Sequence, residues 1–134
     1  MKTKTLTLET GSKRTIVDIT GHVEEFVGGE GDGLINISLL HATAGLALME
    51  LGAGTEEDLW ASIDRVLPPD ARYAHSHGSK GHGASHVLPV YVTPTLTLTV
   101  QGGRVSLGTW QSIALIDPNV DNAARQVLLA FIES

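Results

Sequence analysis

The stretch that decides the fold is Leu34-Ile35-Asn36-Ile37-Ser38-Leu39-Leu40. Apolar and polar side chains alternate along it, so Ile35, Ile37 and Leu39 share one face. Alternation with a period of two is typical of a β-strand that has one face in a protein core. Residues 34–40 therefore predict a strand, and His41 follows directly at its end.

Strands are also predicted on both sides of this segment. Residues 5–19 alternate leucine with threonine and return to apolar residues after a Gly-Ser pair, a pattern that favours a β-hairpin. Residues 95–107 alternate around Gly102-Gly103, and glycine accepts the positive φ that a tight turn needs. The chain therefore reads as β-structure from residue 87 onward. Its tail, residues 127–132, is compatible with either a strand or a helix.

Two main helices are expected between these strands. Thr20 is positioned to cap a short helix whose apolar residues fall on one side, before a glycine cluster at 28–33 ends it. A longer helix is predicted from Thr55, with acidic residues in its first turn, until Pro68-Pro69 stops it. The glycine- and histidine-rich residues 73–85 that follow predict a loop.

Composition limits the classes of protein to which the chain can belong. A length of 134 residues, 42% of them hydrophobic, suits a single domain over residues 1–134 with a core of its own. The formal charge of -6 argues against nucleic-acid binding, which requires a basic surface. Cysteine is absent, which excludes disulfides and thiolate zinc sites. No apolar run approaches the ~20 residues that span a bilayer, so no membrane contact and a cytoplasmic location are expected.

Histidines gather in one part of the sequence. Four of the six lie within twelve positions, at His75, His77, His82 and His86. Imidazoles are the commonest ligands of zinc and related ions, and they act as acid–base groups near neutral pH. Several converging on one pocket would hold a divalent metal, with Glu50 or Asp58 adding a carboxylate. The spacing matches no short zinc motif, so solvated loop histidines without a function are the open alternative.

Other polar residues each have two interpretations that the sequence leaves open. Either His41 presents a reactive imidazole at the end of a strand, as rigid scaffolds commonly do, or its ring only forms a hydrogen bond within its own turn. Asp58 is a capping carboxylate of its helix, or it turns toward a metal or a hydroxyl. Thr109 and Gln111 interrupt an apolar face, so they bond nearby backbone, or they face a ligand or a subunit contact. Trp110 would point the other way, toward another sheet or a partner chain.

The order and spacing of these pieces resemble the YjbQ family over residues 5–132. That family carries a His-Thr-Thr-Ala turn, a glutamate, an Asp-Leu helix, a loop histidine, an Ala-x-His step and a late Gly-Thr-Trp-Gln. The matching residues here are His41-Ala42-Thr43-Ala44, Glu50, Asp58-Leu59, His75, Ala84-Ser85-His86 and Gly108-Thr109-Trp110-Gln111. The departures are Ala42 for threonine, Pro94 for glycine, and Asp117-Pro118-Asn119-Val120 for an acidic-Gly-Pro-Arg step, with Arg125 taken as the family's arginine.

The resemblance implies an α+β fold of one compact domain, with mostly antiparallel sheets packed as a sandwich and the tail as a strand. It also implies a homotrimer around a threefold axis. The implied activity is that of a secondary thiamine-phosphate synthase, which joins a hydroxymethylpyrimidine diphosphate to a thiazole phosphate and releases pyrophosphate. The cofactor would be a divalent metal, Mg²⁺ or Zn²⁺, and the substrate a small phosphorylated compound.

The residues that the resemblance selects fall into three groups. The catalytic residues would be His41, Glu50, Asp58 and His86. The metal ligands would be His41, His75 and His86. The substrate would contact Thr43, Thr109, Gln111 and Arg125. Two alternatives to an enzyme stay open: a module that binds a metal or an anion without turnover, and a protein–protein adaptor that uses Trp110 and exposed sheet edges.

Overall fold

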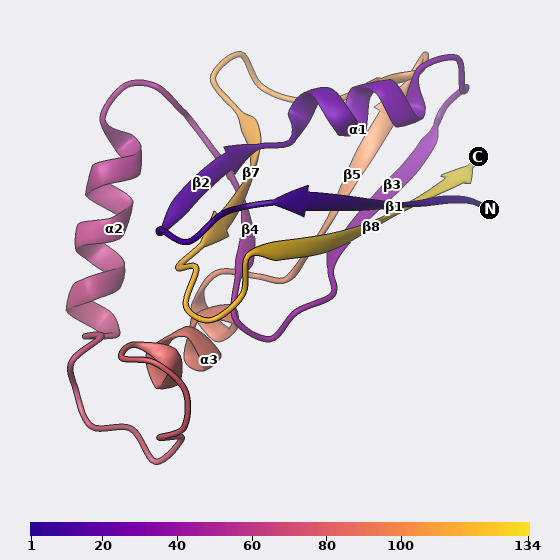
Figure 1. Ribbon diagram of the computed structural model, residues 1–134. Helices are drawn as coiled ribbons and strands as arrows, with labels where there is room; N and C mark the ends of the chain where they lie inside the picture. The colour runs from indigo at the N-terminus through magenta and orange to yellow at the C-terminus, as the bar shows by residue number, and fades with distance from the viewer.

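The computed structural model describes residues 1–134 and contains eight strands and three helices. The strands are β1 (Lys2–Glu9), β2 (Thr15–Asp18), β3 (Gly33–Leu39), β4 (Gly45–Met49), β5 (Thr95–Gln101), β6 (Arg104–Val105), β7 (Ser112–Asp117) and β8 (Ala124–Glu133). The helices are α1 (Thr20–Val27), α2 (Thr55–Val66) and α3 (His82–Tyr91). Figure 1 shows α2 and α3 on the side of the molecule away from the two chain ends, which lie close together because β1 pairs with β8.

The strands form two antiparallel sheets. The larger has the order β1-β8-β3-β5-β6, and the smaller has the order β2-β7-β4. Side chains from both sheets belong to one buried apolar cluster, so the sheets pack against each other around a shared core. This confirms the predicted α+β fold with antiparallel sheets packed as a sandwich.

The hairpin predicted within residues 5–19 is wrong, because β1 pairs with β8 and β2 pairs with β7. Between the two strands, the backbone N–H groups of Thr10 and Gly11 donate to the carbonyl of Ala123, at 2.9 and 3.2 Å. The chain therefore crosses from one sheet to the other at this point. Alternation indicates that a segment is a strand, but it does not specify which strand is its partner.

The strand that the sequence predicts most strongly is β3, and its inward face is the centre of the core. Ile35, Ile37 and Leu39 are all buried, and they meet Ile113 and Leu115 of β7 in the same cluster. Helix α1 adds its buried apolar face to that cluster. Full burial of each such side chain stabilises the fold by about 1.5–3 kcal/mol.

The helix starts differ from the prediction. The N-cap of α2 is Gly54, with a φ of 87°, rather than Thr55, and no side chain caps the helix. Glu56 turns back instead, and its carboxylate accepts the backbone N–H of Gly52 at 3.1 and 3.0 Å. Thr20 lies inside α1, where its Oγ1 accepts a backbone N–H of β7 at 2.8 Å. These polar groups therefore join each helix to its surroundings, which a local capping pattern does not reveal.

Helix α3 lies where the sequence predicts a loop followed by a strand, so there are three helices rather than two. Its Ala84 and Leu88, one helical turn apart, pack with Leu67 beyond the end of α2. This tertiary contact outweighs the poor helix propensity of Gly83 and Pro89, both of which lie within the helix. The wrong prediction followed from composition, which carries no information about such a contact.

The late hairpin is shorter than predicted. Gly102-Gly103 joins β5 to β6 with positive φ at both residues, as expected, but β6 ends at Val105. Residues 106–111 lie outside both sheets, and β7 belongs to the smaller one. The tail is strand β8, as the resemblance implies, and it lies between β1 and β3. No helix of the structure combines the length and the apolar character that crossing a bilayer requires.

Candidate metal centre

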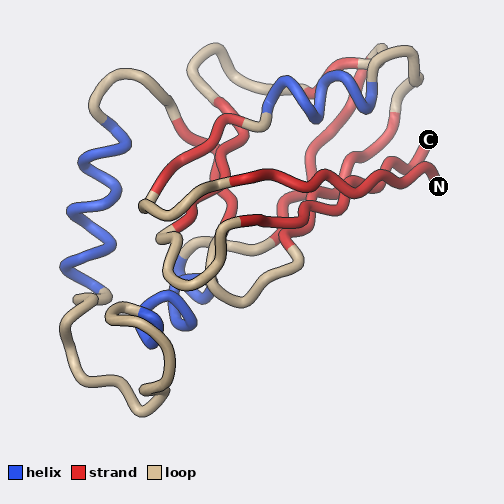
Figure 2. Tube along the Cα trace, viewed as in Figure 1, coloured by secondary structure: helices blue, strands red, loops and turns tan.

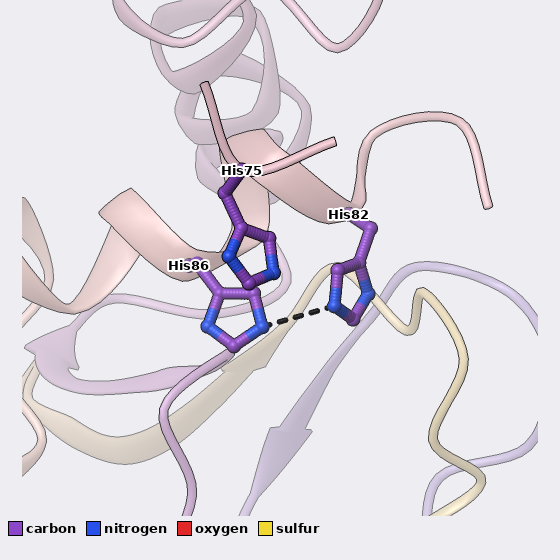
Figure 3. Close-up of side chains that lie close together, drawn as sticks. All are labelled: His75, His82 and His86. Carbon is purple, nitrogen blue, oxygen red and sulfur yellow. Dashed lines mark hydrogen bonds between the residues drawn. The ribbon is translucent and has the colours of Figure 1, made fainter. Parts of the chain in front are cut away.

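Three histidine side chains converge where α3 meets the long loop that precedes it. Figure 2 shows this loop in tan between the two helices α2 and α3. His82 and His86 are one turn apart on α3, so their rings lie on the same side of the helix. Their Nε2 atoms are 3.0 Å apart. Figure 3 marks this contact with a dashed line. The ring of His75 comes from the loop, and its centroid lies 4.2 Å from that of His86 and 5.2 Å from that of His82. One ring nitrogen from each histidine lies within 4.8 Å of the other two.

A glycine in α3 brings the loop close enough for this arrangement. A Cβ atom at Gly83 would lie 2.6 Å from the carbonyl oxygen of His75 and 2.6 Å from the Cβ of Tyr73. Only hydrogen at that position lets the loop backbone rest against the helix. Tyr73 fixes the loop further, because its hydroxyl donates to the carbonyl of Pro68 at 2.8 Å.

An acidic residue from a distant loop lies behind His82. Asp121 Oδ2 is 3.2 Å from His82 Nδ1, the nitrogen that points away from His86. The carboxylate also accepts the backbone N–H of Ser79 at 2.7 Å and the hydroxyl of Ser79. These two hydrogen bonds, followed by the proximity of His82, lower the pKa of Asp121. Asp121 is therefore an anion that joins the β7–β8 loop to the histidine loop.

The electrostatics of the cluster favour neutral imidazoles. The pKa of His75 and the pKa of His86 are both lowered, first by partial desolvation and then by the neighbouring histidine rings. A proton on one ring raises the cost of a second proton on the next ring. Neutral imidazoles keep a nitrogen lone pair, which is what a metal ion requires of a histidine ligand.

The nitrogen spacing of the His82–His86 pair is close to that of a first-row metal site, whereas the 4.8 Å that bounds the whole set exceeds the roughly 4.1 Å that two ligands of one zinc ion span, so a ring has to move when a metal binds. In a tetrahedral zinc site with Zn–N bonds of about 2.0–2.1 Å, two ligand nitrogens lie about 3.3 Å apart. The distance between His82 Nε2 and His86 Nε2 is 3.0 Å, and a small side-chain movement would bring it to that value. Three histidine ligands with a remaining open position are typical of catalytic rather than structural zinc sites. His77 lies beside the cluster, with its ring centroid 4.0 Å from that of His75.

The predicted metal set of His41, His75 and His86 is brought together only in part. His75 and His86 meet, but the third converging imidazole is that of His82. His41 lies in the loop after β3, where its Nε2 accepts the backbone N–H of Gln126 at 2.9 Å. Burial lowers the pKa of His41, and the charge of Arg125 lowers it further against the opposing effect of Asp117. His41 is therefore a neutral ring whose Nε2 lone pair is already engaged.

Two of the predicted substrate residues form a buried network. Arg125 and Asp117 are both 0% exposed, and the guanidinium donates to both carboxylate oxygens, at 2.9 Å from Nε and 2.7 Å from Nη2. Its Nη1 donates to the hydroxyl of Thr43 at 2.7 Å. The guanidinium of Arg125 is therefore engaged in hydrogen bonds to Asp117 and Thr43 inside the protein. A contact between Arg125 or Thr43 and a substrate stays a prediction.

The remaining predicted residues lie elsewhere. Strand β4 pairs with β7, with Gly45 opposite Ile116 at its first end and Met49 opposite Ser112 at its second end. These two ends of β4 are about 13 Å apart along the strand. Thr43 precedes the first end, and the exposed side chains at the second end are those of Glu50, Thr109 and Gln111. Asp58 is exposed in the first turn of α2. Within one chain, none of these carboxylates joins the histidine cluster.

The turn that carries Gln111 explains its polarity. Gln111 Oε1 accepts the backbone N–H of Gly108 at 2.8 Å, and the backbone N–H of Gln111 donates to the carbonyl of Gly108 at 3.1 Å. The apolar strand face that Thr109 and Gln111 were expected to interrupt does not exist, because both residues lie in this turn. Trp110 projects from it with 72% of its surface exposed.

His82 and Asp121 belong to this arrangement but were not among the selected site residues, for different reasons. His82 and His86 have the i, i+4 spacing that places two ligands on one side of a helix, but the spacing is informative only if the segment is known to be helical. Asp121 lies thirty-nine positions after His82, and no local pattern connects them.

A polar hollow of about 230 Å³ adjoins the cluster. It is formed by the loop before α3 and the first residues of that helix. Arg72 and Lys80 supply positive charge, and His75, His77 and Ser79 supply further polar groups. The hollow therefore offers room for a small anionic molecule beside the histidines.

Comparisons with known proteins agree with this fold. The family model described as UPF0047 protein YjbQ-like matches residues 4–134. The chain is 51% identical over 133 residues to the UPF0047 protein Rv2556c of Mycobacterium tuberculosis, with 99% of each chain covered. The crystal structure of the hypothetical protein APE1520 from Aeropyrum pernix is similar with a TM-score of 0.89 and 28% identity, and both chains are fully covered. The structure of SSO2532 from Sulfolobus solfataricus, at 23% identity, is similar in fold with a TM-score of 0.90, over 99% of this chain and 97% of that one.

These comparisons contradict the expected thiamine-phosphate synthase activity. The relatives are described as UPF0047 or YjbQ proteins without an activity, and SSO2532 is described as a protein of unknown function. The resemblance of motifs therefore identified relatives correctly but not a reaction. Since the match extends over almost the whole sequence, the chain belongs to the UPF0047, YjbQ-like family.

Proposed function

We propose that the chain binds one divalent transition-metal ion, zinc in the first place, through His75, His82 and His86. The observation that carries this proposal is the convergence of one nitrogen from each of the three rings within 4.8 Å. Imidazole nitrogens suit zinc, whereas Mg²⁺ prefers oxygen ligands and retains several waters. Of the two metals expected from the sequence, zinc therefore fits this ligand set better.

The site would use its open position for chemistry on a bound molecule. Three protein ligands leave room for a water or a substrate oxygen, and a zinc-bound water in such a site ionises near neutral pH, with a pKa of about 7. The lowered pKa of His75 and His86 keeps both ligands free of competing protons in the same range. This supports a metal site that acts on a substrate over one that only stabilises the fold.

The proposed substrate is a small phosphorylated compound. Phosphate oxygens are ligands for a metal with an open position, and Arg72 and Lys80 line the hollow beside the cluster. The hollow is about 230 Å³, which suits a compound of few atoms rather than a polymer.

We also propose that the chain assembles as a homotrimer through the outer face of the larger sheet. Successive outward residues of β1, β8, β3 and β5 are uncharged along the middle of that face, although the chain has 24 charged side chains from 9 basic and 15 acidic residues. Leu34 and Ile132 lie opposite each other there, 46% and 54% exposed. Such an uncharged, unpaired face is typical of a contact between subunits.

The metal proposal is tested by measuring metal content and affinity on the purified protein. The wild-type chain is expected to bind about one zinc ion per chain by calorimetry and elemental analysis. The double variant His82→Ala/His86→Ala is expected to bind none at the same concentration. His22→Ala is the matched control, because His22 is an exposed histidine on α1 outside the cluster. Equal zinc binding by the double variant, or no binding by the wild type, would overturn the proposal.

A further inference from the structure

His82 has a different neighbour at each ring nitrogen. Its Nε2 faces His86 Nε2 at 3.0 Å, so this nitrogen is the one available to a shared metal. Its Nδ1 is buried and has no hydrogen bond of good geometry to any protein atom. Asp121 Oδ2, at 3.2 Å, is the acidic oxygen beside it. A buried N–H without an acceptor costs stability, so a slight rotation that aligns this pair is favourable.

Contacts other than the one to His82 hold Asp121 in place. Its carboxylate accepts both the backbone N–H and the hydroxyl of Ser79. Its own backbone is in the left-handed region, with a φ of 67°, a conformation that is uncommon for non-glycine residues but that aspartate adopts more readily than most. In the same loop, the side-chain amide of Asn119 donates to the carbonyls of Thr10 and Lys13, at 2.7 and 2.8 Å. The loop is therefore fixed to the body of the protein on one side and to the histidine loop on the other.

The chain leaves space for this contact at a single glycine. A Cβ atom at Gly78 would lie 2.7 Å from His82 Cγ and 2.8 Å from Asp121 Oδ2, and the φ of Gly78 is 83°. Any larger residue would occupy the gap through which the carboxylate approaches the ring. The contact at the Nδ1 edge of His82 thus depends on three residues. Gly78 leaves the space, Ser79 holds the carboxylate, and Asp121 supplies it.

We infer that Asp121 is the positioning residue of the metal centre: it accepts the Nδ1–H of His82 and thereby fixes the tautomer whose Nε2 lone pair points toward His75 and His86. The inference rests on the proposed metal function. Asp121 is not itself one of the converging ligands, because the set that shares a common point consists of the three histidines. A carboxylate behind a ligating histidine orients the ring and makes its nitrogen a better donor, and loss of such a partner costs about 10–100-fold in metal affinity.

The first measurement is the tautomer of His82 in the metal-free wild type, by nitrogen-resolved NMR at a pH where the ring is neutral. The expected result is a proton on Nδ1 and a lone pair on Nε2. A His82 that carries its proton on Nε2 would overturn the inference. This measurement needs neither a variant nor a bound metal, so it decides the hydrogen bond even if the chain binds no zinc.

The second measurement compares zinc affinity in Asp121→Ala, Asp121→Asn and the control Asp70→Asn. Asp70 is an exposed carboxylate in the loop between α2 and α3 that makes no hydrogen bond, so it reproduces the change in charge alone. Asp121→Ala is expected to bind zinc about 10–100-fold more weakly than the wild type, Asp121→Asn to fall between them because its amide oxygen still accepts, and the control to match the wild type. If Asp121→Ala does not fold, the zinc affinity of Asp121→Asn and the tautomer of His82 in the wild type test the inference.

The outcomes separate the two proposals. Absence of zinc binding in the wild type would end the proposed function. Zinc binding in the wild type that Asp121→Ala retains within twofold would leave the metal site in place and end the role of Asp121. A shift of the His82 ring toward a mixed tautomer in Asp121→Ala, together with weaker zinc binding, would support it, because a purely structural role for the loop would not change the tautomer.

Discussion

His82 Nε2 and His86 Nε2 lie 3.0 Å apart across one turn of α3. In the metal-free protein one of these nitrogens donates to the other, so the pair shares a single proton at that position. A metal that binds both nitrogens must displace this proton. The pair therefore connects the protonation of the cluster to the occupancy of the site.

The metal-free protein is expected to lose stability as the pH falls below about 6.5, the ordinary pKa of histidine. The pKa values of His41, His75 and His86 are lowered in the folded chain, mainly by desolvation. Between the lowered and the ordinary pKa the unfolded chain binds more protons than the folded chain, so the free energy of unfolding rises with pH there. Above that window the contribution is fully present.

Urea unfolding at a series of pH values measures this effect. The variant His86→Ala should show a shallower slope of stability against pH, since one of the depressed groups is removed. Saturating zinc should raise stability at neutral pH and lose its effect on acidification, because protons compete for the ligands. A free energy of unfolding that is constant or increases toward low pH would contradict the prediction.

Gly83→Ala should weaken both the fold and zinc binding. Its new Cβ would lie 2.6 Å from backbone and side-chain atoms of residues 73–75, so His75 must move away from α3. Overpacking of this kind costs about 1–3 kcal/mol, although alanine is the better helix former. Gly21→Ala in α1 is the control, because a Cβ there meets nothing within 4 Å. Calorimetry and chemical unfolding of both variants give the comparison, and a neutral Gly83→Ala would disprove the close approach of the loop.

Removal of Asp117 should destabilise the protein severely. Arg125 would remain fully buried without its carboxylate, and leaving one partner of a buried ion pair costs about 3–5 kcal/mol. The double variant Asp117→Leu/Arg125→Met should lose less, since no isolated charge remains. Equilibrium unfolding in urea measures both. A double variant less stable than Asp117→Leu alone would show that Arg125 contributes by other means.

Gln111→Ala should cost little stability and leave zinc affinity unchanged. The variant loses the hydrogen bond from Gly108 in an exposed turn, which is a contribution of about 0.5–1.5 kcal/mol. The turn lies at the end of β7 away from the histidines, so no direct effect on the metal follows within one chain. A clear loss of zinc affinity would instead mean that a neighbouring copy brings Gln111 to the cluster.

Charge on the outer face of the larger sheet should break the proposed trimer. Leu34→Lys combined with Ile132→Lys places two like charges opposite each other on neighbouring strands, where a subunit contact would have to desolvate them. Sedimentation analysis should show a trimer for the wild type and smaller species for the variant. Val66→Lys, at an exposed position on α2, is the control. A wild-type monomer, or a variant that sediments as the wild type, would refute the interface.

Prediction from the sequence succeeded where the signal was local and repeated. The alternation in residues 34–40 corresponds to β3, which ends at Leu39 and has its expected face buried. Residues 95–101 are also a strand, on whose expected face Val100 is buried while Leu96 and Leu98 are partly buried. The helix after residue 54 also formed as its apolar stripe indicated. Prediction failed at α3, where glycine, proline and histidine suggested a loop, whereas the packing of Ala84 and Leu88 against Leu67 favours a helix.

Taken alone, the amino-acid sequence determined the strand after residue 33 with its buried face, the strand at residues 95–101 and the family, because side-chain periodicity and motif order are properties of the chain itself. The tertiary structure alone decided which strands pair, that His82 rather than His41 joins the cluster, and that Asp121 lies behind it. The physical reason is that these contacts join segments far apart in the chain, and their energies depend on packing at Gly78 and Gly83 that no local pattern records.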